Sequence, residues 1–275
     1  MIPPLQLLAP LVWRDGACRG VAERAVPEET AIALTFGRET YAVMMATPAD
    51  LEDFAIGFAL TEQVIAAPDE IASLAVREYP DGIELRMELA GGREAALTAR
   101  RRRLAGPTGC GLCGVDSLAE AVRPPPPVPP GRRVSAAEIA QALAALGPRQ
   151  TLNAATRSVH AAALWRPGHP LLLREDVGRH NALDKLVGAA ARAGIAAADS
   201  MVILTSRVSI EMVQKAAVLG APVLVAISAP TAHAVRLAEA AGMTLVAVAR
   251  GDGFEVFTGG GRIVERAETE PADAA

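Results

Sequence analysis

A dense run of prolines near the middle of the chain limits what this sequence can fold into. Pro124–Pro127, Pro129 and Pro130 fill six of seven consecutive positions, and Gly131 follows them. Proline has no amide hydrogen and fixes φ at about −65°, so this run cannot continue a helix or a central strand. A stiff, extended spacer is expected instead. The run therefore predicts a division of the 275-residue chain into segments of different character.

Upstream of the prolines, the pattern predicts a small α+β domain over residues 20–105. Four strands are expected in two hairpins: Ala31–Phe36 with Thr40–Met45, and Ile71–Tyr79 with Ile83–Leu89. Between the hairpins, Thr47 is expected to cap a helix, with Pro48 in its first turn. Apolar residues recur at helical spacing from Leu51 to Phe58. A cysteine-containing loop and the proline-rich linker then occupy residues 106–134.

Downstream, residues 135–265 alternate helical patterns with short apolar runs, which predicts an α/β domain with a mainly parallel sheet covered by helices. Ser135 and Glu138 form a capping box for a helix that Gly147 and Pro148 end. The expected strands are Leu171–Val177, Met201–Thr205, Pro222–Ile227 and Thr244–Val248, and the expected helices between them are Asn181–Ala193, Ser209–Leu219 and Thr231–Ala240.

Composition excludes several classes of function. The net charge of −4 and the low aromatic content of 3% argue against nucleic acid as a partner, which favours basic surfaces and stacking aromatics. No apolar run approaches the roughly 20 residues that span a bilayer, so no membrane association is expected. The apolar N-terminus lacks the charged leader of a signal peptide. The cytoplasm is therefore the expected compartment.

Two closely spaced cysteines are the sharpest local feature. Cys110 and Cys113 lie in a loop that contains four glycines, Gly106, Gly109, Gly111 and Gly114, and this leaves space for a second protein to approach the sulfurs. A thiol reacts as the thiolate, which nearby positive charge favours, and Arg100–Arg103 precede the loop. Cys110 resembles the attacking cysteine, and Cys113 is placed to assist or resolve.

The pattern alone leaves three interpretations of this pair open. It could be half of a structural zinc site, completed by a second protomer because the chain has no second CxxC. It could be a dithiol switch, although the βαβ context of thioredoxin-like proteins is absent. It could also carry sulfur from a donor to an acceptor. Cys18 stands alone and is expected to be an inert free thiol.

Polar loops follow three of the predicted strands, each leading into a predicted helix. These loops contain Arg179 and His180, then Ser206 and Arg207, and then Ser228–Thr231. Open α/β sheets bind ligands at the carboxyl ends of their strands, and helix N-termini favour anions. A phosphate-bearing ligand therefore suits this edge, although each serine or threonine alone is more simply a helix cap. His160 and His180 have no metal-spaced partner, and a hydrogen-bonded structural role is the simpler expectation for each.

Taken together, these motifs resemble the formate dehydrogenase accessory sulfurtransferases, the FdhD family. The resemblance covers residues 20–265, and its most specific part is Arg174–Lys185. The matching segments are Asp53–Phe58 with Thr61 and Glu62, Cys110–Gly114, Thr156–Ala162, Arg174–Lys185, Ser206–Ser209, Glu211–Lys215 and Ser228–Thr231.

The resemblance implies a sulfurtransferase that takes persulfide sulfur from an L-cysteine desulfurase and transfers it to the Mo-bis(molybdopterin guanine dinucleotide) cofactor, bound as substrate, for formate dehydrogenase. It implies that Cys110 carries the persulfide and that a homodimer forms. It also implies a cytidine-deaminase-like three-layer sandwich and a cofactor-binding stretch at Phe254, Glu255, Val256, Phe257, Thr258 and Gly259. A cofactor-binding chaperone with an inter-subunit zinc site is the alternative.

Two features depart from what that resemblance implies. Cytidine deaminases hold zinc with H-x-E and P-C-x-x-C motifs, and neither occurs in this chain, so the fold likeness does not imply deamination. Family members often have a tyrosine near the position of Phe257, so any contact from a hydroxyl group is lost there.

Overall fold

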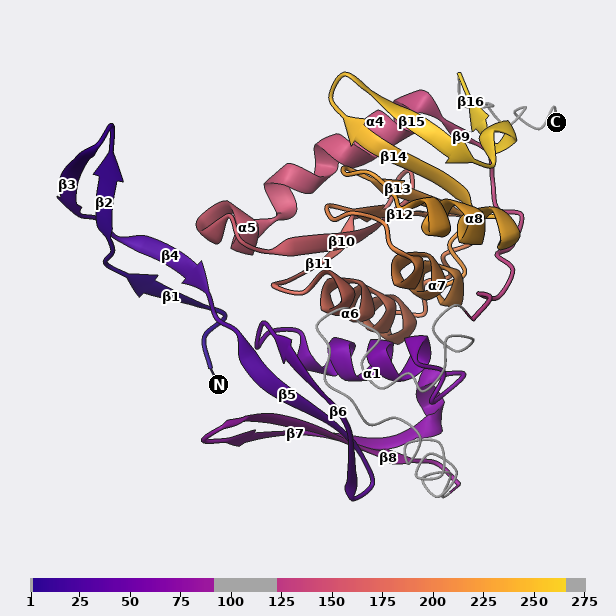
Figure 1. Ribbon diagram of the computed structural model, residues 1–275. Helices are drawn as coiled ribbons and strands as arrows, with labels where there is room; N and C mark the ends of the chain where they lie inside the picture. Colours follow the sequence, from indigo (N-terminus) through magenta and orange to yellow (C-terminus); the bar gives the residue numbers. More distant parts are fainter. Residues whose placement is uncertain (1, 92–122, 266–275) are drawn as a thin grey trace. The chain divides into compact units, whose positions relative to one another are not determined.

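The computed structural model describes residues 2–91 and 123–265 (Figure 1). These residues form two compact units that interleave along the sequence. Unit 1 holds residues 2–91, 150–161 and 174–189, and unit 2 holds residues 123–149, 162–173 and 190–265. The segment boundaries inferred from the sequence stay a prediction, since one of them falls outside the described residues.

Unit 1 is built on a four-stranded sheet with the order β6-β5-β8-β7. Its strands are β5 (Thr30–Phe36), β6 (Glu39–Ala46), β7 (Ile71–Tyr79) and β8 (Gly82–Leu89). The β5–β6 and β7–β8 hairpins confirm the predicted pairs, and β5 runs parallel to β8. Helix α1 (Leu51–Thr61) and the short 3-10 helix η1 (Pro68–Glu70) lie in the connection between the hairpins. The side chains of α1 pack on one face of the sheet in a common hydrophobic core.

The start of α1 corrects the expected cap. Thr47 does not cap the helix, because the N-cap is Asp50, which adopts a left-handed conformation with φ 53° and makes no side-chain capping bond. The Thr47 hydroxyl instead accepts a hydrogen bond from the Val177 amide at 3.1 Å. The segment before α1 is therefore fixed by contacts distant in sequence rather than by local capping.

The N-terminal hairpin, Leu5–Pro27, was not predicted. Its strands are β1 (Leu5–Leu8), β2 (Leu11–Arg14), β3 (Ala17–Val21) and β4 (Arg24–Pro27). β1 pairs with β4, and β2 pairs with β3, both antiparallel. Asp15 and Gly16 at the tip both have positive φ, as a type I′ turn requires. Nearly every residue of β1, β2 and β3 is exposed, so this hairpin has no covering layer in the described chain.

Unit 2 is built on a six-stranded sheet with the order β11-β10-β12-β13-β14-β15. The strands are β10 (His160–Trp165), β11 (Leu172–Asp176), β12 (Met201–Leu204), β13 (Val223–Ala226), β14 (Thr244–Arg250) and β15 (Gly253–Thr258). The first residues of β10 and the last of β11 belong to unit 1. The sequence missed β10, and β15 was expected only as a binding stretch.

The prediction of a mainly parallel sheet is correct only for its centre. β12–β13 and β13–β14 are parallel, whereas β10–β12 and β14–β15 are antiparallel, so the sheet is mixed. The continuous apolar runs that predicted parallel strands are those of β12 and β13, and every residue of these two strands is buried. Of the outer strands, β11 lies within the predicted strand Leu171–Val177, whereas β10 contains three consecutive alanines, which do not favour strands, and was missed.

Helices lie on both faces of this sheet. Helix α4 (Ala136–Leu146) packs on one face with Met201, Ile203 and Val225, and its predicted capping box is confirmed. Helices α7 (Ile210–Val218) and α8 (Ala232–Ala240) follow β12 and β13, as predicted, and cover the other face (Figure 1). The remaining elements are short: η2 (Gly147–Arg149), α5 (Thr151–Thr156), η3 (Gly260–Arg262), and β16 (Ile263–Val264) paired with β9 (Val134–Ser135). Helix α6 (Arg179–Arg192) lies mostly in unit 1.

Within the described ranges, none of the helices combines the length and the apolar character that crossing a membrane would require.

Candidate functional site

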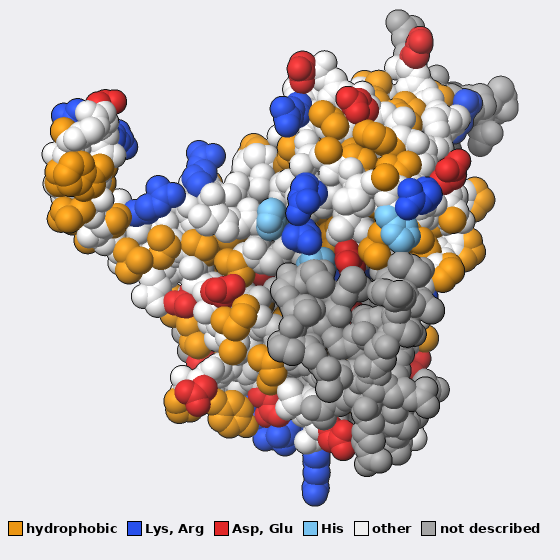
Figure 2. Space-filling view, in the orientation of Figure 1, with side chains coloured by type: hydrophobic (Ala, Val, Ile, Leu, Met, Phe, Trp, Pro, Cys, Tyr) orange, Lys and Arg blue, Asp and Glu red, His pale blue; other side chains and the backbone are white. Residues whose placement is uncertain are grey.

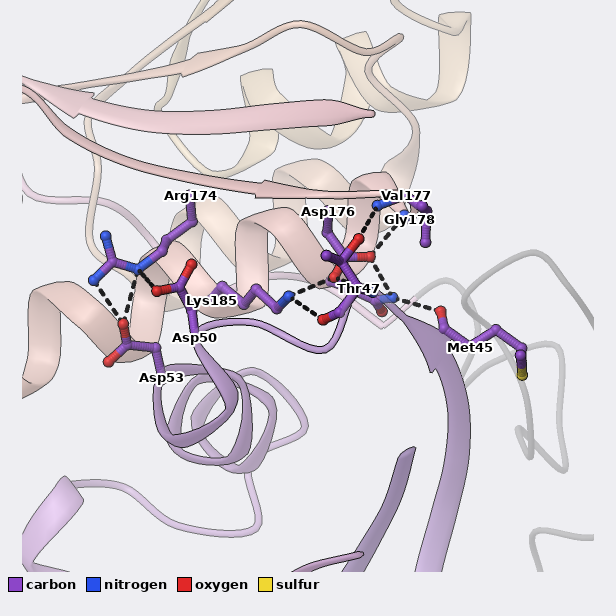
Figure 3. Close-up of polar contacts among 10 residues, drawn as sticks. Met45, Thr47, Asp50, Asp53, Arg174, Asp176, Val177, Gly178 and Lys185 are labelled. Carbon is purple, nitrogen blue, oxygen red and sulfur yellow. Dashed lines mark hydrogen bonds and ion pairs between the residues drawn. The ribbon is translucent and has the colours of Figure 1, made fainter. Parts of the chain in front are cut away.

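A buried ion pair lies at the centre of the contacts in unit 1. The Lys185 ammonium lies 2.6 Å from Oδ2 of Asp176, and both side chains are 0% exposed (Figure 3). The same ammonium donates to the carbonyl of Thr47 at 2.9 Å, and the Thr47 amide donates to Oδ2 of Asp176 at 3.0 Å. Because charges buried away from water are costly unless they are paired and hydrogen-bonded, this arrangement fixes both side chains in one geometry.

The other carboxylate oxygen of Asp176 holds the start of α6. Oδ1 accepts a hydrogen bond from the Gly178 amide at 2.8 Å and another from the Asn181 side chain at 3.0 Å. The Asn181 amide nitrogen also donates to the carbonyl of Met45, at the end of β6. Asp176 therefore ties together β6, the segment before α1 and the first turn of α6.

A second ion pair secures the start of α1. Nη2 of Arg174 lies 2.7 Å from Oδ2 of Asp53, and its Nε lies 3.5 Å from the Asp50 carboxylate (Figure 3). Arg174 is partly exposed, whereas Asp53 is buried. The Phe54 ring packs beneath the Lys185 ammonium, 5.8 Å from the ring centroid. These contacts explain why an acidic and an aromatic residue stand together at the start of α1.

Helices α1 and α6 cross at two glycines. A Cβ atom added at Gly57 would overlap the carbonyl oxygen of Asp184, and one added at Gly188 would overlap the carbonyl oxygen of Asp53. Only glycine allows the two backbones to approach this closely. The Thr61 hydroxyl donates to the Asp184 carboxylate at 2.6 Å beside the crossing. We call this set of contacts, from Met45–Thr61 to Arg174–Gly188, the clamp.

Three cationic or titratable side chains gather where α6 begins. His160 starts β10, and Arg179 and His180 are the first residues of α6. Burial lowers the pKa of His160, the charges of Arg179 and His180 lower it further, and Asp176 opposes them. The Nε atom of Arg179 is buried and has no hydrogen-bond partner in the described part of the chain. We call His160, Arg179 and His180 the cationic group.

The loop before His160 is held in place by Glu175. Both carboxylate oxygens of this buried residue accept backbone N–H groups at the start of α5, from Leu152 and Asn153, each at 2.8 Å. Helix α5 ends at Arg157, which is left-handed with φ 59°. A non-glycine residue in this conformation is uncommon, and here it turns the chain towards His160. Glu175 thus fixes the start of α5, the helix that precedes His160 in the chain.

The cationic group brings together two residues that the sequence predicted and one whose expected role was different. Arg179 and His180 were expected to bind a phosphate-bearing ligand, whereas His160 was expected to be a structural residue. The sequence around His160 gave no sign of its neighbours, because they lie about 20 positions away, beyond β10 and β11. The backbone N–H groups at the start of α6 add a further attraction for anions.

In unit 2, two of the predicted polar loops lie side by side. The Val208 amide donates to the Ala229 carbonyl at 3.3 Å, and the Thr231 amide donates to the Val208 carbonyl at 2.9 Å. Thr231 caps α8, as the simpler expectation held, by accepting from Ala234 at 3.2 Å. Ser209 is the N-cap of α7, but its hydroxyl makes no capping bond.

The predicted residues Ser206 and Arg207 differ in their exposure. Ser206 is buried, and its hydroxyl donates to the carbonyl of Arg207 at 3.1 Å. Arg207 is exposed, so its guanidinium is accessible to solvent at the carboxyl end of β12. The assignment of these two residues to a bound ligand stays a prediction.

The predicted cofactor-binding stretch, Phe254–Gly259, forms β15 and the residue after it. Phe254 packs against the core of unit 2, while Val256 and Phe257 are exposed. The Thr258 hydroxyl accepts from the Leu245 amide and donates to the Met243 carbonyl. The stretch thus forms an edge strand of the sheet, and Glu255, Val256 and Phe257 are the members that offer exposed side chains.

An open groove of about 630 Å³ lies at the far end of this stretch. Its lining includes Gly131, Arg133, Gly242, Gly259 and Arg262. Burial lowers the pKa of Arg262, whose guanidinium donates to the carbonyl of Pro130 at 2.8 Å and to the Thr244 hydroxyl. Arg262 therefore ties the chain together at this groove rather than offering a vacant donor set.

Cys110, Cys113 and the neighbouring Arg100–Arg103 lie outside the described residues. Cys18 is free and exposed on β3. In the part of the chain that the structure covers, no three His, Cys, Asp or Glu side chains are placed to hold a metal ion.

Comparison with known proteins identifies the family. The model of the FdhD/NarQ family matches residues 27–264. The chain belongs to the FdhD/NarQ family. It is 53% identical to the "Sulfur carrier protein FdhD" of Agrobacterium fabrum over 244 residues, which cover 88% of this chain and 90% of that one. It is 54% identical to the protein of the same name from Brucella abortus over 246 residues, 89% and 91% of the two chains.

A solved structure supports the fold. The crystal structure of a putative formate dehydrogenase accessory protein from Desulfotalea psychrophila matches with a TM-score of 0.75 and 26% sequence identity. The match covers 95% of this chain and 100% of that one. This mixed α/β architecture is therefore the architecture of a solved family relative.

Proposed function

We propose that this chain is a cytoplasmic sulfur carrier in formate dehydrogenase maturation. Cys110 accepts sulfur as a persulfide from an L-cysteine desulfurase and passes it to the Mo-bis(molybdopterin guanine dinucleotide) cofactor, which the chain binds as substrate. The active form is a homodimer. Support comes from the match to the FdhD/NarQ family over residues 27–264 and from relatives over 50% identical that are named sulfur carrier proteins.

The observation that carries the cofactor-binding part is the cationic group. Arg179 keeps a buried Nε atom without a hydrogen-bond partner among the described residues, beside His160 and His180. Buried donors are normally satisfied, and each exception calls for an explanation. A phosphate oxygen of the guanine dinucleotide supplies the missing acceptor. Charge-assisted bonds of this kind are roughly twice as strong as neutral ones.

The sulfur transfer follows from thiol–disulfide chemistry. The Cys110 thiolate attacks the outer sulfur of the donor's persulfide, the donor's sulfur–sulfur bond breaks, and the donor cysteine leaves as a thiolate. For release, the Cys113 thiolate attacks the Cys110 sulfur atom. The Cys110–Cys113 disulfide forms, and the outer sulfur leaves as sulfide, which balances the two electrons. A dithiol reductant then restores both cysteines.

The binding residues act by position and charge. In unit 1, the first N–H groups of α6 and the Arg179 guanidinium bind the phosphates. In unit 2, Arg207 and the exposed side chains of β15 are the residues that we assign to the cofactor from the family resemblance. We also propose that unit 2 is a cytidine-deaminase-like core. The parallel β12, β13 and β14 with helices on both faces are in keeping with that assignment.

Intact mass measurement tests the sulfur-carrier function. Incubation with an L-cysteine desulfurase and cysteine is expected to add one sulfur atom, about 32 Da, to the wild type and none to Cys110→Ala. Cys18→Ala is the matched control, because it removes an exposed thiol far from the proposed chemistry in sequence, and its adduct is expected to persist. An unmodified wild type rejects the sulfur-carrier function. A zinc ion at about half occupancy per chain, with no sulfur adduct, supports the chaperone alternative instead.

A further inference from the structure

Three consecutive charged residues of β11 hold three different helices. Arg174 binds the start of α1 through Asp53, and Asp176 holds the first turn of α6. Successive side chains of a strand point to opposite faces, so Glu175, between these two residues, points away from the clamp. Its partner is α5, a helix that the proposed function does not use.

Glu175 supplies the cap that α5 lacks. Gln150, at the N-cap position, makes no side-chain capping bond. The carboxylate oxygens of Glu175 accept instead from the amides of Leu152 and Asn153, the second and third residues of the helix, which a local cap would normally satisfy. A helix of six residues is marginal by itself, and a negative charge at its N-terminus stabilises it. The start of α5 therefore depends on a carboxylate 22 or 23 positions away in the chain.

A short series of hydrogen bonds connects the start of α5 to His160. The Thr156 hydroxyl donates to the Leu152 carbonyl at 2.8 Å and accepts from the Ser158 amide at 3.4 Å, and Thr156 is buried. Arg157, between these two residues, adds the left-handed turn. His160 then begins β10, the neighbour of β11 in the sheet. Glu175 on β11 thus helps to set where His160 lies.

His160 and Arg179 can both reach a ligand. The charges of Arg179 and His180 lower the pKa of His160, which places its ring close to the start of α6. His160 and Arg179 are each partly exposed, and Figure 2 shows histidine side chains, in pale blue, lying next to blue Lys or Arg side chains at the surface. A neutral imidazole has one N–H donor and a protonated one has two. In either form, His160 can donate to an anion that Arg179 also binds.

We infer that Glu175 is a positioning residue for the phosphate of the ligand: by capping α5 it holds His160 beside Arg179, so that both side chains donate to the same phosphate group. This inference rests on the proposed function, because it takes the cationic group as the place where the guanine dinucleotide binds. A carboxylate in direct contact with a phosphate would repel it. Glu175 therefore acts through α5 and not by touching the ligand.

Glu175→Gln in the full-length protein tests the placement of His160. The amide keeps one acceptor oxygen and presents an NH2 group where the second α5 amide needs an acceptor, so one of the two bonds is lost. Hydrogen exchange is expected to become faster in residues 151–160 and to stay unchanged in α1, which Arg174 holds. In NMR titrations of the unliganded protein, the pKa of His160 is expected to rise towards 6.5, as its ring moves away from Arg179 and into water.

Calorimetry with guanosine diphosphate tests what this placement is for. The affinity of Glu175→Gln is expected to fall about tenfold, which corresponds to the loss of about one hydrogen bond. Glu138→Gln is the matched control, because Glu138 is buried to the same extent and also accepts from a backbone amide, in the capping box of α4. It is expected to change neither the affinity nor the pKa of His160.

A rescue variant separates positioning from a general loss of stability. Glu175→Gln combined with Gln150→Asp replaces the distant cap of α5 with a local one and restores the net charge. Hydrogen exchange in residues 151–160, the pKa of His160 and the affinity are all expected to return close to their wild-type values.

Three results overturn the inference while leaving the proposed function intact. They are an unchanged pKa of His160 in Glu175→Gln, a wild-type affinity in Glu175→Gln although α5 exchanges faster, and a loss of affinity that the local cap does not restore. A wild type that does not bind guanosine diphosphate rejects the cofactor-binding part of the proposed function, and the inference with it. None of these results bears on whether Cys110 gains sulfur.

Discussion

The clamp and the cationic group both take residues from one short segment, Arg174–Lys185, but their charged groups differ in whether the protein itself supplies their partners. In the clamp, the charges of Asp176 and Lys185 face each other in the dry interior, and backbone groups complete their hydrogen bonds. In the cationic group, Arg179 keeps a buried donor without an acceptor among the described residues. The charges of the clamp are paired within the protein, and we propose that a bound anion supplies the acceptor that Arg179 lacks.

This difference suggests that, within one motif, the clamp stabilises the fold and the cationic group binds a ligand. A buried pair loses much when one member is removed, because the other charge is stranded. The Nε atom of Arg179 has no acceptor among the described residues, so we expect replacement of Arg179 to weaken binding of the proposed ligand more than it weakens folding. Substitutions in the two regions are therefore expected to separate cleanly, and the following tests are ordered from the largest expected effect on stability to the smallest.

Lys185→Met is expected to lower the free energy of unfolding by about 3–5 kcal/mol, because it leaves the Asp176 carboxylate buried and uncompensated. Urea denaturation followed by circular dichroism measures the change. The matched variant combines Lys185→Met with Asp176→Leu, which removes both charges, and is expected to recover part of the loss. A single variant within 1 kcal/mol of the wild type contradicts the role given to the clamp.

Gly57→Ala is expected to lower the free energy of unfolding by about 2–3 kcal/mol, since the added methyl group overlaps the Asp184 backbone and forces α1 away from α6. Thermal and urea unfolding measure the loss. Gly147→Ala is the control, because nothing lies within 4 Å of its added Cβ and its backbone is right-handed. Equal losses in the two variants show that the crossing has no special requirement for glycine.

Arg179→Gln is expected to change the free energy of unfolding by no more than about 0.5 kcal/mol, because its side chain makes none of the contacts described for the clamp. Its effect is on binding, and the affinity for guanosine diphosphate, used as a probe of the cofactor's tail, is expected to fall at least tenfold in calorimetry. Arg192→Gln, at the other end of α6, is the control and keeps the affinity. If Arg179→Gln lowers the free energy of unfolding but keeps the affinity for guanosine diphosphate, the roles given to the two regions are wrong.

His160→Gln is expected to have the smallest effect on stability, and the effect appears only as a change in how the melting temperature depends on pH. Its pKa is lowered from 6.5 by burial and by the charges of Arg179 and His180, so the unfolded chain binds the proton more readily than the folded one. Stability therefore falls as the pH drops through 6.5 towards the lower pKa of the folded state. Melting temperatures from pH 8 to 5 are expected to fall less steeply in His160→Gln. Parallel profiles for the two proteins contradict the lowered pKa.

Local sequence patterns predicted helices and strands correctly where neighbouring residues alone determine the backbone conformation. The capping box of Ser135 and Glu138 and the turn between Tyr79 and Gly82 are settled by neighbours in sequence, and both predictions are confirmed. Thr47 looked like a cap for the same local reasons. Its hydrogen-bonding groups were taken by Asp176 and Val177, about 130 residues away, and no local signal reports that competition.

The candidate site shows the same limit. The segment Arg174–Lys185 stood out as the most specific part of the sequence, but the pattern did not tell the residues of the clamp from those of the cationic group. Asp53, Thr61 and Lys185 were noted only as matching residues, because their partners are distant in sequence. The roles of Cys110 and Cys113 rest on the resemblance and their chemistry, since the structure does not describe them.

The interleaving of the two units has a consequence for the order in which the chain is made. The sheet of unit 1 and α1 lie within the first 91 residues, but α6, which completes the clamp, is not synthesised until residue 192. During translation, the acidic start of α1 and Gly57 have no contact with α6 until roughly 120 more residues have been synthesised. Unit 1 can therefore complete its fold only late in synthesis. Because each unit is made of three separate segments, neither can be expressed as one continuous fragment.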